Sequence, residues 1–282
     1  MRRSSHGESS VLLTMSAVLF HSSLDELHAL IDSVIAGIKS AGLSSVEFIL
    51  VDHSGCDQYA ERCRSLLATY DNDSAVRLEL LQMPENRGYG AGHNAAALRV
   101  SAPFHLVLNP DVVLSERTID LLLNALQAND DIALLAPVGF DSAGAPAFLA
   151  KAYPSVWVLG LRGFAPEWVK RKCAHTLGSY ELRNTLNEQP IRSVTLASGC
   201  CMLLRRSVFD EIGGFDESFF LYFEDYDLSL KMAQHGAVKE HSGAHIIHHG
   251  GKAAGKGWNH MRWFVTSAVR FFNRWGWRWL GP

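Results

Sequence analysis

The feature that most constrains the fold of this chain is a regular alternation, over its first half, of short apolar runs and amphipathic helical segments. Brief runs rich in branched residues are typical of strands buried in a parallel sheet. The pattern therefore predicts an α/β fold with right-handed crossovers and helices on both faces of a mostly parallel, doubly wound sheet. The expected strands are Val11–Phe20, Val46–Val51, Val76–Leu81, His105–Leu108 and Ile132–Pro137.

Helices are expected between these strands. Apolar residues recur at helical spacing between Ser23, which is the expected N-cap, and Gly42, which ends the segment. A second helix is expected from Cys56 to Tyr70. Ser115 is the expected cap of another helix that runs through Gln127.

The second half of the chain has a less regular pattern. Residues 139–192 scatter glycine, proline and aromatic residues without a period, so we expect an irregular segment, either an acceptor-side insertion or a covering layer. An apolar run resumes at Val194–Arg205, and a helix is expected from Glu224 through Gln234. A short strand at Ala244–His248 and a helix from Trp258 to Leu280 complete the chain.

Composition excludes several classes of protein. With 26 basic and 29 acidic residues, the net charge of −3 gives no support for nucleic-acid binding. No apolar segment is long enough to span a bilayer, and no small-residue cleavage site follows Val11–Phe20. The five cysteines lack zinc-site spacing, so we expect reduced thiols in a cytoplasmic protein.

Polar residues follow several of the expected strands. Ligands of open α/β sheets bind beyond the carboxyl ends of strands. Asp52 stands at such an end, and Asn109-Pro110-Asp111 stops the fourth strand. A carboxylate such as Asp111 can hold a hard divalent cation there, although the same residues also form ordinary turns. His248 ends a strand too and suits the same cation, although a lone histidine is usually structural.

A glycine-rich loop follows the third strand. Gly88, Gly90 and Gly92 have G-x-G-x-G spacing, which differs from the G-x-G-x-x-G of dinucleotide-binding folds, and no P-loop motif is present. Amide groups at the start of the following helix can bind a pyrophosphate. A tight turn without a ligand explains the glycines equally well.

Carboxylates gather between residues 216 and 227, interleaved with Phe219, Phe220, Tyr222 and Phe223. Desolvation by such neighbours raises the pKa of a carboxylate toward the range of a general base. Acidic residues are also favoured at the start of any helix. A structural role is the better interpretation for Glu224 and Asp227, whereas Asp225 fits either role. The group comprises Asp216, Glu217, Glu224, Asp225 and Asp227.

Taken together, these residues resemble the family 2 glycosyltransferases of the GT-A fold, which are inverting enzymes that use nucleotide-diphosphate sugars. Within that family the chain is most similar to bacterial rhamnosyl- and galactofuranosyl-type transferases of O-antigen, capsule and cell-wall synthesis. The motifs occur in family order at Glu85–Asn94, Leu108–Asp111, Ser198-Gly199, Gly213–Phe220, Glu224–Asp227 and His248–Gly251.

The resemblance implies a domain organisation. A GT-A domain with a Rossmann-like sheet is expected over residues 11–255. Its nucleotide-binding half would span residues 11–138 and its acceptor-binding half residues 139–255. A flexible N-terminus (1–10) would precede it, and an aromatic and basic helix (256–282) would follow.

The resemblance also implies site residues. Asp225 would be the general base, and Asp111 and His248 would hold Mg²⁺ or Mn²⁺. Acceptor contacts would come from Asp216, Glu217 and Glu224. Departures from the family pattern are His21, which replaces an asparagine, and Lys252-Ala253, which replace a serine. The implied donor-binding residues are Phe20, Asp52, Asn86, Gly88, Gly90, Asn94, Asn109, Asp111 and Gly199.

The implied activity is transfer of rhamnose from dTDP-rhamnose to a glycan or lipid-linked glycan. A uracil or thymine donor is expected because Asp52 can accept a hydrogen bond from the N3–H of either base. The alternative is a catalytically silent GT-A module that binds a glycan or a partner in an assembly complex.

The C-terminal helix suggests a membrane contact. Arg270, Arg274 and Arg278 repeat along one face among tryptophan and phenylalanine residues, which suits an anionic membrane interface. Peripheral attachment to the inner face of the cell membrane would follow. Docking of the same aromatics onto the domain, or onto a second subunit of an oligomer, is the alternative.

Overall fold

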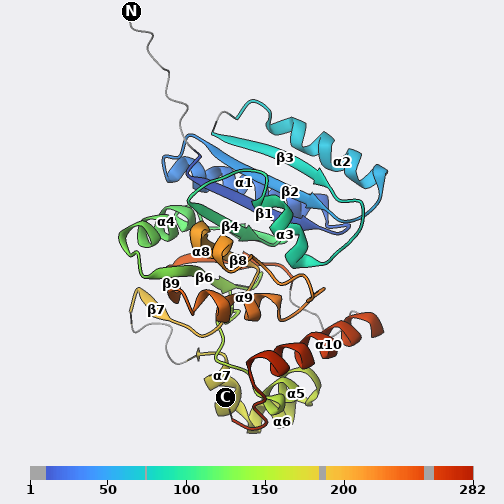
Figure 1. Ribbon diagram of the computed structural model, residues 1–282, viewed down its shortest axis with the longest axis vertical. Coiled ribbons are helices and arrows are strands. Elements are labelled where there is room, and N and C mark those ends of the chain that lie inside the picture. Colours follow the sequence, from blue (N-terminus) through green and yellow to red (C-terminus); the bar gives the residue numbers. More distant parts are fainter. Residues whose placement is uncertain (1–10, 74, 184–188, 251–256, 282) are drawn as a thin grey trace, which may run out of the picture.

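The expected alternation of strands and helices is present through residue 140 (Figure 1). The computed structural model describes residues 11–73, 75–183, 189–250 and 257–281, so the expectations for residues 1–10 and for Gly251, Lys252 and Ala253 lie outside it. The elements are β1 (Leu13–Leu19), α1 (Leu24–Ser40), β2 (Val46–Asp52), α2 (Asp57–Leu67), η1 (Ala68–Tyr70), β3 (Val76–Gln82), α3 (Tyr89–Ala97), β4 (Phe104–Leu108), β5 (Val112–Leu114), α4 (Thr118–Ala128) and β6 (Ile132–Phe140).

All five apolar runs form strands, and Ser23 caps α1 by accepting a hydrogen bond from the Glu26 amide. The expected cap at Ser115 is wrong, because α4 begins at Thr118 and Arg117 is its N-cap residue. Ser115 instead accepts the Thr118 amide through its carbonyl oxygen (2.9 Å). Sequence reasoning missed β5, because three residues are too few to show a strand period.

The second half adds α5 (Val156–Phe164), α6 (Glu167–Lys172), α7 (Ala174–Tyr180), β7 (Ile191–Ser193), β8 (Cys201–Arg205), α8 (Arg206–Glu211), α9 (Glu224–Met232), β9 (Ala237–His248) and α10 (Trp258–Trp275). The expectation of an irregular 139–192 segment is wrong, since it contains three helices. Their apolar period is hidden because α6 buries no residue and α5 buries only Val158 and Leu161. β9 is longer than expected, and α10 stops at Trp275 because Gly276 adopts a φ of 104°.

The strands form one sheet of nine strands in the described residues, with the order β3-β2-β1-β4-β8-β6-β9-β5 and β7 paired to β9. β3, β2, β1 and β4 are mutually parallel, as the sequence predicted. β8 lies antiparallel between β4 and β6, so β6 does not continue the parallel set directly. The central sheet is therefore mixed but mostly parallel.

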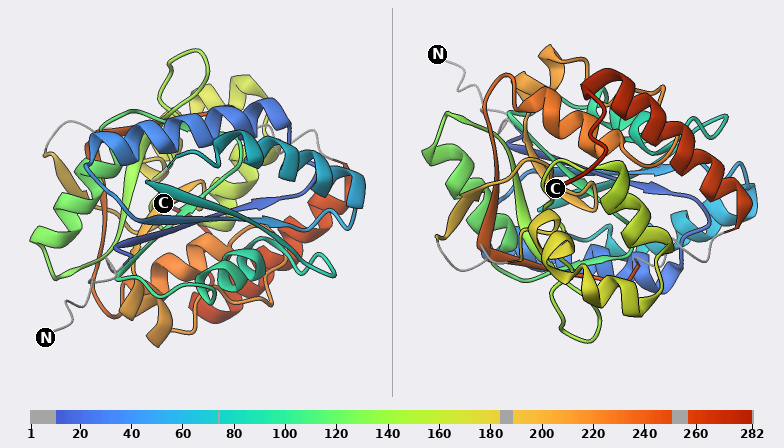
Figure 2. Two further views of the ribbon diagram at one scale, coloured as in Figure 1. Left: turned by 90° about the horizontal axis from the view of Figure 1, so that it is seen from above. Right: turned by 90° about the horizontal axis from the view of Figure 1, so that it is seen from below.

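Two apolar layers flank the sheet (Figure 2). α1, α2 and α4 bury their leucine and isoleucine side chains on one face, and α3, α8 and α9 cover the other. The helices α5, α6 and α7 lie with α10 at the lower end in Figure 1. In the register of the sheet, Leu19 is opposite Asp52 and Ala17 is opposite Leu108. The carboxyl ends of β1, β2 and β4 therefore share one edge, where the site is built.

Candidate active site

Asp52 presents an unsatisfied acceptor at this edge. It ends β2 with 1% of its surface exposed, and its Oδ1 atom accepts a hydrogen bond from the Ser54 amide (2.8 Å). Its Oδ2 atom is buried and has no hydrogen-bond partner among the described residues. Buried carboxylate oxygens are normally satisfied, so a bound ligand with an N–H group fits here. Phe20 follows β1 and leaves 59% of its surface exposed.

The glycines of the loop before α3 are sites of close packing. Gly88 has a φ of 98°, and a Cβ atom there would lie 2.3 Å from the Phe220 carbonyl oxygen. A Cβ atom on Gly90 would lie 2.7 Å from Cβ of Phe215. Asn86 shapes the turn by accepting the Gly88 amide (2.9 Å). The structure thus explains both glycines by packing, and their contact with a donor stays a prediction.

Asn94 fixes the same packing from α3. Its Oδ1 atom accepts the Phe215 amide and its Nδ2 atom donates to the Phe215 carbonyl oxygen, both at 2.9 Å. The Nδ2 atom also lies 3.1 Å from Oε1 of Glu217. Because both ends of the amide are occupied, Asn94 holds the loop in place here. A direct contact of Asn94 with a donor is untested.

Asp111 and His248 come together as the sequence predicted. Val112 pairs with His248 across the antiparallel β5 and β9, which sets Asp111 Oδ1 3.3 Å from His248 Nε2. Both side chains remain partly exposed. A Cβ atom on Gly250 would lie 2.0 Å from Asp111 Oδ2, so a larger residue would fill the space beside the carboxylate.

A carboxylate oxygen and an imidazole nitrogen are ligands that suit Mg²⁺ or Mn²⁺. Across the described part of the chain, no group of three or more His, Cys, Asp or Glu side chains is placed to hold a metal ion. Asp111 and His248 are thus two neighbouring side chains of suitable chemistry, and their binding of an ion stays a prediction.

Tyr89 connects this pair to the other side of the site, and sequence reasoning did not single it out. Its hydroxyl oxygen lies 2.9 Å from Oδ1 of Asn109 and 2.6 Å from the Gly199 carbonyl oxygen. The Nδ2 atom of Asn109 in turn lies 3.4 Å from Nε2 of His248. Burial raises the pKa of Tyr89 well above its ordinary value, so the hydroxyl stays protonated and can donate. Its place inside the glycine loop was the signal available in the sequence.

Asp225 lies in the first turn of α9 and faces Gly199. Its Oδ2 atom accepts the Gly199 amide (3.0 Å), and its Oδ1 atom accepts the Tyr226 amide (2.9 Å). Burial raises the pKa of Asp225 to about 6, although these hydrogen bonds act in the opposite direction. The carboxylate is therefore held rigidly and is more basic than an ordinary aspartate.

Glu224 differs from its neighbour in protonation. Its side chain is buried, and its Oε2 atom has no hydrogen-bond partner among the described residues. Burial, and then the negative charge of Asp225, raises the pKa of Glu224 well above its ordinary value. At neutral pH we therefore expect Asp225 to be ionised, whereas burial favours the neutral form of Glu224.

Asp216 and Glu217 form ion pairs within the protein. Asp216 lies 2.6 Å from an Nη atom of Arg274, and its Oδ1 atom accepts the Ser218 amide. Burial would raise the pKa of Asp216, but Ser218 and Arg274 outweigh it and lower the pKa to about 2. Glu217 lies 2.6 Å from an Nη atom of Arg87. Contacts of these two carboxylates with an acceptor remain predictions.

The aromatic side chains of α10 pack largely on the domain. Phe271 and Phe272 are buried against Phe219 and Phe223 of the acidic segment. Arg274, which the sequence placed on a membrane face, instead contacts Asp216 and the buried Asp227, at 2.6 and 2.7 Å. This face of α10 is therefore docked onto the domain, which was the alternative to a membrane contact. Within the described residues, no helix is both long and apolar enough to cross a membrane.

The mixed sheet, with helices on both faces, has the architecture of the GT-A glycosyltransferase fold. Residues 17–213 match the family described as Glycosyl transferase family 2. The chain belongs to this family, as the ordered motifs predicted. The matched range contains Asp52, Asp111 and Gly199, whereas Asp225 and His248 lie beyond it.

The chain is similar to rhamnosyltransferases in sequence. It is 26% identical over 239 residues to the N-acetylglucosaminyl-diphospho-decaprenol L-rhamnosyltransferase of Mycobacterium tuberculosis, covering 80% of this chain and 74% of that protein. It is 29% identical over 99 residues to the rhamnosyltransferase WbbL of Escherichia coli (strain K12), covering 33% and 37% of the two chains.

Solved structures show the same fold at low identity. GalNAc-T7, solved with UDP, GalNAc and Mn²⁺, matches 95% of this chain with a TM-score of 0.64 and 14% identity. S. aureus TarS 1-349 matches 93% with a TM-score of 0.55 and 14% identity. The chain spans 48% of the first solved chain and 66% of the second.

Proposed function

We propose that the chain is an inverting, metal-dependent glycosyltransferase that moves a sugar from a nucleotide-diphosphate donor to a hydroxyl group of a glycan or lipid-linked glycan. The observation that carries this proposal is the environment of Asp225. Its carboxylate has a pKa raised to about 6, and two backbone amides hold it on a helix. A general base is most effective when its pKa lies near the working pH and its position is fixed.

The transfer step follows from this placement. Inversion requires the acceptor oxygen to attack the anomeric carbon on the face opposite the departing diphosphate. Asp225 would take the proton of that hydroxyl as the new carbon–oxygen bond forms and the bond to the diphosphate breaks. Glu224 would compete less well for the proton, because its side chain is more deeply buried beside Asp225.

The donor is proposed to be a dTDP- or UDP-sugar. The free, buried Oδ2 atom of Asp52 supports this choice, because it can accept the N3–H of thymine or uracil. Guanine also carries a ring N–H group, at N1, so the titration with GDP described below separates it from the pyrimidine donors. Rhamnose is proposed as the sugar because two relatives carry the name rhamnosyltransferase.

Asp111 and His248 are proposed to hold one Mg²⁺ or Mn²⁺ ion. When bound, the ion would neutralise negative charge on the donor diphosphate. Tyr89 and Asn109 would orient His248 through the contacts described above. Asp111→Ala is expected to abolish metal-dependent nucleotide binding while the fold stays intact.

A thermal-shift titration tests this donor site. We expect dTDP or UDP with Mn²⁺ to raise the melting temperature, and a metal chelator to remove the effect. Asp111→Ala should melt at the wild-type temperature without nucleotide and show no metal-dependent shift. Preferential stabilisation by GDP would contradict the pyrimidine assignment, and an undiminished shift in Asp111→Ala would remove that residue from the site.

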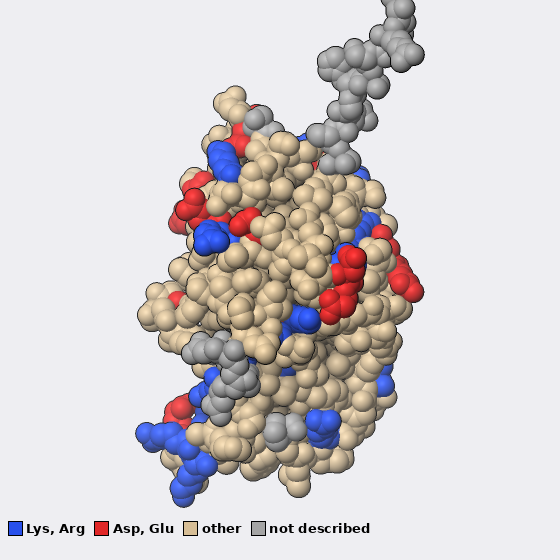
Figure 3. All heavy atoms as spheres, turned by 90° about the vertical axis from the view of Figure 1, so that its left-hand side faces the viewer, with Lys and Arg blue, Asp and Glu red and all other residues tan. Residues whose placement is uncertain are grey.

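A lipid-linked acceptor is proposed on the basis of the M. tuberculosis relative, whose name includes a diphospho-decaprenol. Peripheral attachment to the inner membrane face would suit such an acceptor. The segment after α10 runs beside α5, because the Trp157 amide donates to the Trp279 carbonyl oxygen (3.2 Å). Trp279 and Leu280 are 63% and 75% exposed. Figure 3 shows lysine and arginine side chains gathered at this lower end of the molecule.

Vesicle sedimentation tests the membrane contact. Vesicles of phosphatidylglycerol should sediment the wild-type protein, and Trp279→Ala with Leu280→Ala should reduce the sedimented fraction. Trp258→Ala is the matched control, because Trp258 is 81% exposed at the opposite end of α10. The membrane proposal fails if the vesicles leave the wild-type protein in the supernatant, or if the control variant is affected as strongly.

A further inference from the structure

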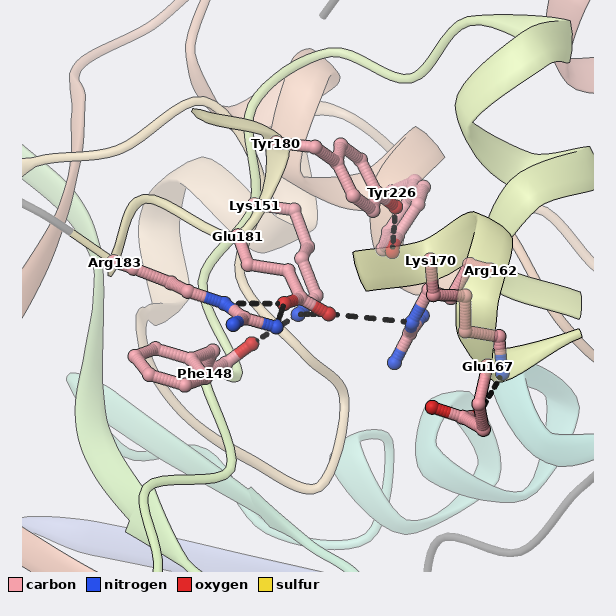
Figure 4. Close-up of polar contacts among 9 residues, drawn as sticks. All are labelled: Phe148, Lys151, Arg162, Glu167, Lys170, Tyr180, Glu181, Arg183 and Tyr226. Carbon is pink, nitrogen blue, oxygen red and sulfur yellow. Dashed lines mark hydrogen bonds and ion pairs between the residues drawn. The ribbon is translucent and has the colours of Figure 1, made fainter. Parts of the chain in front are cut away.

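A cluster of positive charges surrounds one carboxylate in the segment between β6 and β7 (Figure 4). Glu181 accepts a hydrogen bond from Nε of Arg183 (2.8 Å). One of its oxygens also lies 3.7 Å from Nζ of Lys151 and 3.6 Å from Nε of Arg162. A single carboxylate thus serves three cationic side chains, which leaves positive charge in excess.

Burial makes this excess costly. The Lys151 side chain is 4% exposed and also donates to the Phe148 carbonyl oxygen. Burial, and then the charge of Arg162, lowers the pKa of Lys151 to about 7. The side chains of Arg162 and Arg183 remain about half exposed, so a ligand can reach both guanidinium groups. A partly buried surplus of cations is favourable when an anion completes it.

Two connections place the cluster beside the proposed base. The backbone groups of Lys151 pair with those of Leu196 (2.9 and 3.0 Å), three residues before Gly199, whose amide donates to Asp225. The Tyr180 hydroxyl lies 2.8 Å from the hydroxyl of Tyr226, the residue after Asp225. Figure 4 shows this tyrosine pair directly above the cluster.

The cluster and the Asp111–His248 pair are thus joined to the proposed base through different residues. The cluster is joined through Leu196 and Tyr226, and the Asp111–His248 pair through Tyr89 and Asn109. An acceptor whose hydroxyl reaches Asp225 would carry its more distant groups toward the cationic side chains, while the donor diphosphate would bind at the Asp111–His248 pair.

We propose that Lys151, Arg162 and Arg183 form an acceptor-side subsite for a phosphate or diphosphate group of the acceptor. This rests on the proposed function, since it assumes that Asp225 faces the acceptor. A guanidinium group binds phosphate oxygens through paired N–H donors. A diphosphate that joins two groups carries about two negative charges, one per phosphate. Arg162 and Arg183, offset by Glu181, leave one positive charge, and a bound dianion would favour the protonated form of Lys151, which adds the second. A single carboxylate would leave part of the surplus uncompensated.

Calorimetric titration with inorganic pyrophosphate tests the subsite, with a chelator present so that the donor metal site cannot contribute. The wild-type protein should bind pyrophosphate, and Arg162→Gln or Arg183→Gln should each weaken the affinity about tenfold or more. Arg171→Gln is the matched control, because Arg171 is exposed in α6. Its affinity should stay within about twofold of the wild type.

The location of the bound anion is checked with Asp111→Ala, in which pyrophosphate binding should persist. Arg162→Lys and Arg183→Lys keep the charge but lose the paired donors, so they should weaken binding even if the glutamine variants do not fold. Absence of binding to the wild type, equal affinities in the Arg162, Arg183 and Arg171 variants, or loss of binding in Asp111→Ala would each overturn the proposal.

Two further ligands separate the sources of the phosphate. Geranyl diphosphate, a soluble prenyl diphosphate, should displace pyrophosphate, whereas phosphatidylglycerol vesicles should not. Displacement by the vesicles alone would assign the cluster to membrane lipid and overturn the acceptor subsite. Failure of the proposed function would appear elsewhere, as a lack of stabilisation by dTDP or UDP with Mn²⁺ in the absence of pyrophosphate.

Discussion

Turnover should fall as the pH drops below about 6, because Asp225 can accept the proton of the acceptor only when it is ionised. The raised pKa places about nine tenths of the carboxyl groups in the ionised form at pH 7 and about one tenth at pH 5. The value of kcat/KM should therefore decrease about tenfold across that interval. An ordinary aspartate, with a pKa of about 3.9, would lose little activity over the same range.

Two substitutions separate Asp225 from its neighbour. Asp225→Asn removes the base, so kcat should fall by about a hundredfold or more while nucleotide-sugar affinity is retained. Glu224→Gln should lose much less, because burial favours the neutral form of Glu224 and glutamine has nearly the same shape as that form. Its activity should still fall below about pH 6.

The assay is the initial rate of donor turnover from about pH 4.5 to about pH 8.5 at saturating metal, with circular dichroism at each pH to confirm the fold. A decline centred near pH 4 would show that Asp225 is not the titrating base. A dead Glu224→Gln variant beside a normal Asp225→Asn variant would assign the base to the neighbour.

Two stability predictions follow from the packing around the site. Gly88→Ala should destabilise the fold by more than about 2 kcal/mol in urea unfolding, because φ is 98° and the new Cβ atom meets the Phe220 backbone. Gly42→Ala, at a φ of 65° in open space, should cost only about 1 kcal/mol. Arg274→Gln should cost about 1–2 kcal/mol, since it removes one ion pair of the buried Asp227, which keeps Lys231 and Trp275 as partners. The exposed Arg262→Gln should change stability by less than about 0.5 kcal/mol, and equal effects of the two arginine variants would refute the role of Arg274.

The strands and their ends could be predicted because each strand appears in the sequence as a short, continuous run of apolar residues. The apolar runs of β1, β2, β4 and β6 are buried on both faces, so they stand out without knowledge of their partners, whereas the edge strand β3 is only partly buried. The carboxyl ends of parallel strands meet at one edge of the sheet. Asp52 and Asp111 could therefore be identified as candidate site residues from the sequence. His248 could be placed for the same reason, since it also ends a strand.

The remaining elements depend on partners that are distant in sequence. The antiparallel direction of β8 is not encoded in its apolar pattern, which is the same for either direction. The first half of β9 carries polar residues such as Lys239 and His241, so it does not appear as an apolar run in the sequence. Its strand conformation is stabilised by pairing with β6 and β7. The two helices α5 and α6 bury too few residues to show a period.

The interpretation of single site residues was limited in a similar way. A glycine that admits a ligand and a glycine that admits another part of the protein look alike in sequence, so the packing of Gly88 against Phe220 and of Gly90 against Phe215 could not be predicted, and their contact with a donor stays a prediction. Arg274 was placed on a membrane face because its partners Asp216 and Asp227 lie far along the chain. Similarly, the sequence did not predict that Lys151, Arg162 and Arg183 would gather around Glu181.

Release of nucleotide from candidate donors is the most direct measurement of whether this GT-A domain is a working enzyme. The purified protein is incubated with dTDP-rhamnose and with other dTDP-, UDP- and GDP-sugars, with and without Mn²⁺ or Mg²⁺, and the free nucleoside diphosphate is quantified. We expect release from a dTDP- or UDP-sugar that requires the metal and is lost in both Asp111→Ala and Asp225→Asn. Binding of dTDP or UDP without release from any donor would show a catalytically silent module, and metal-independent release that survives both substitutions would contradict the proposed site.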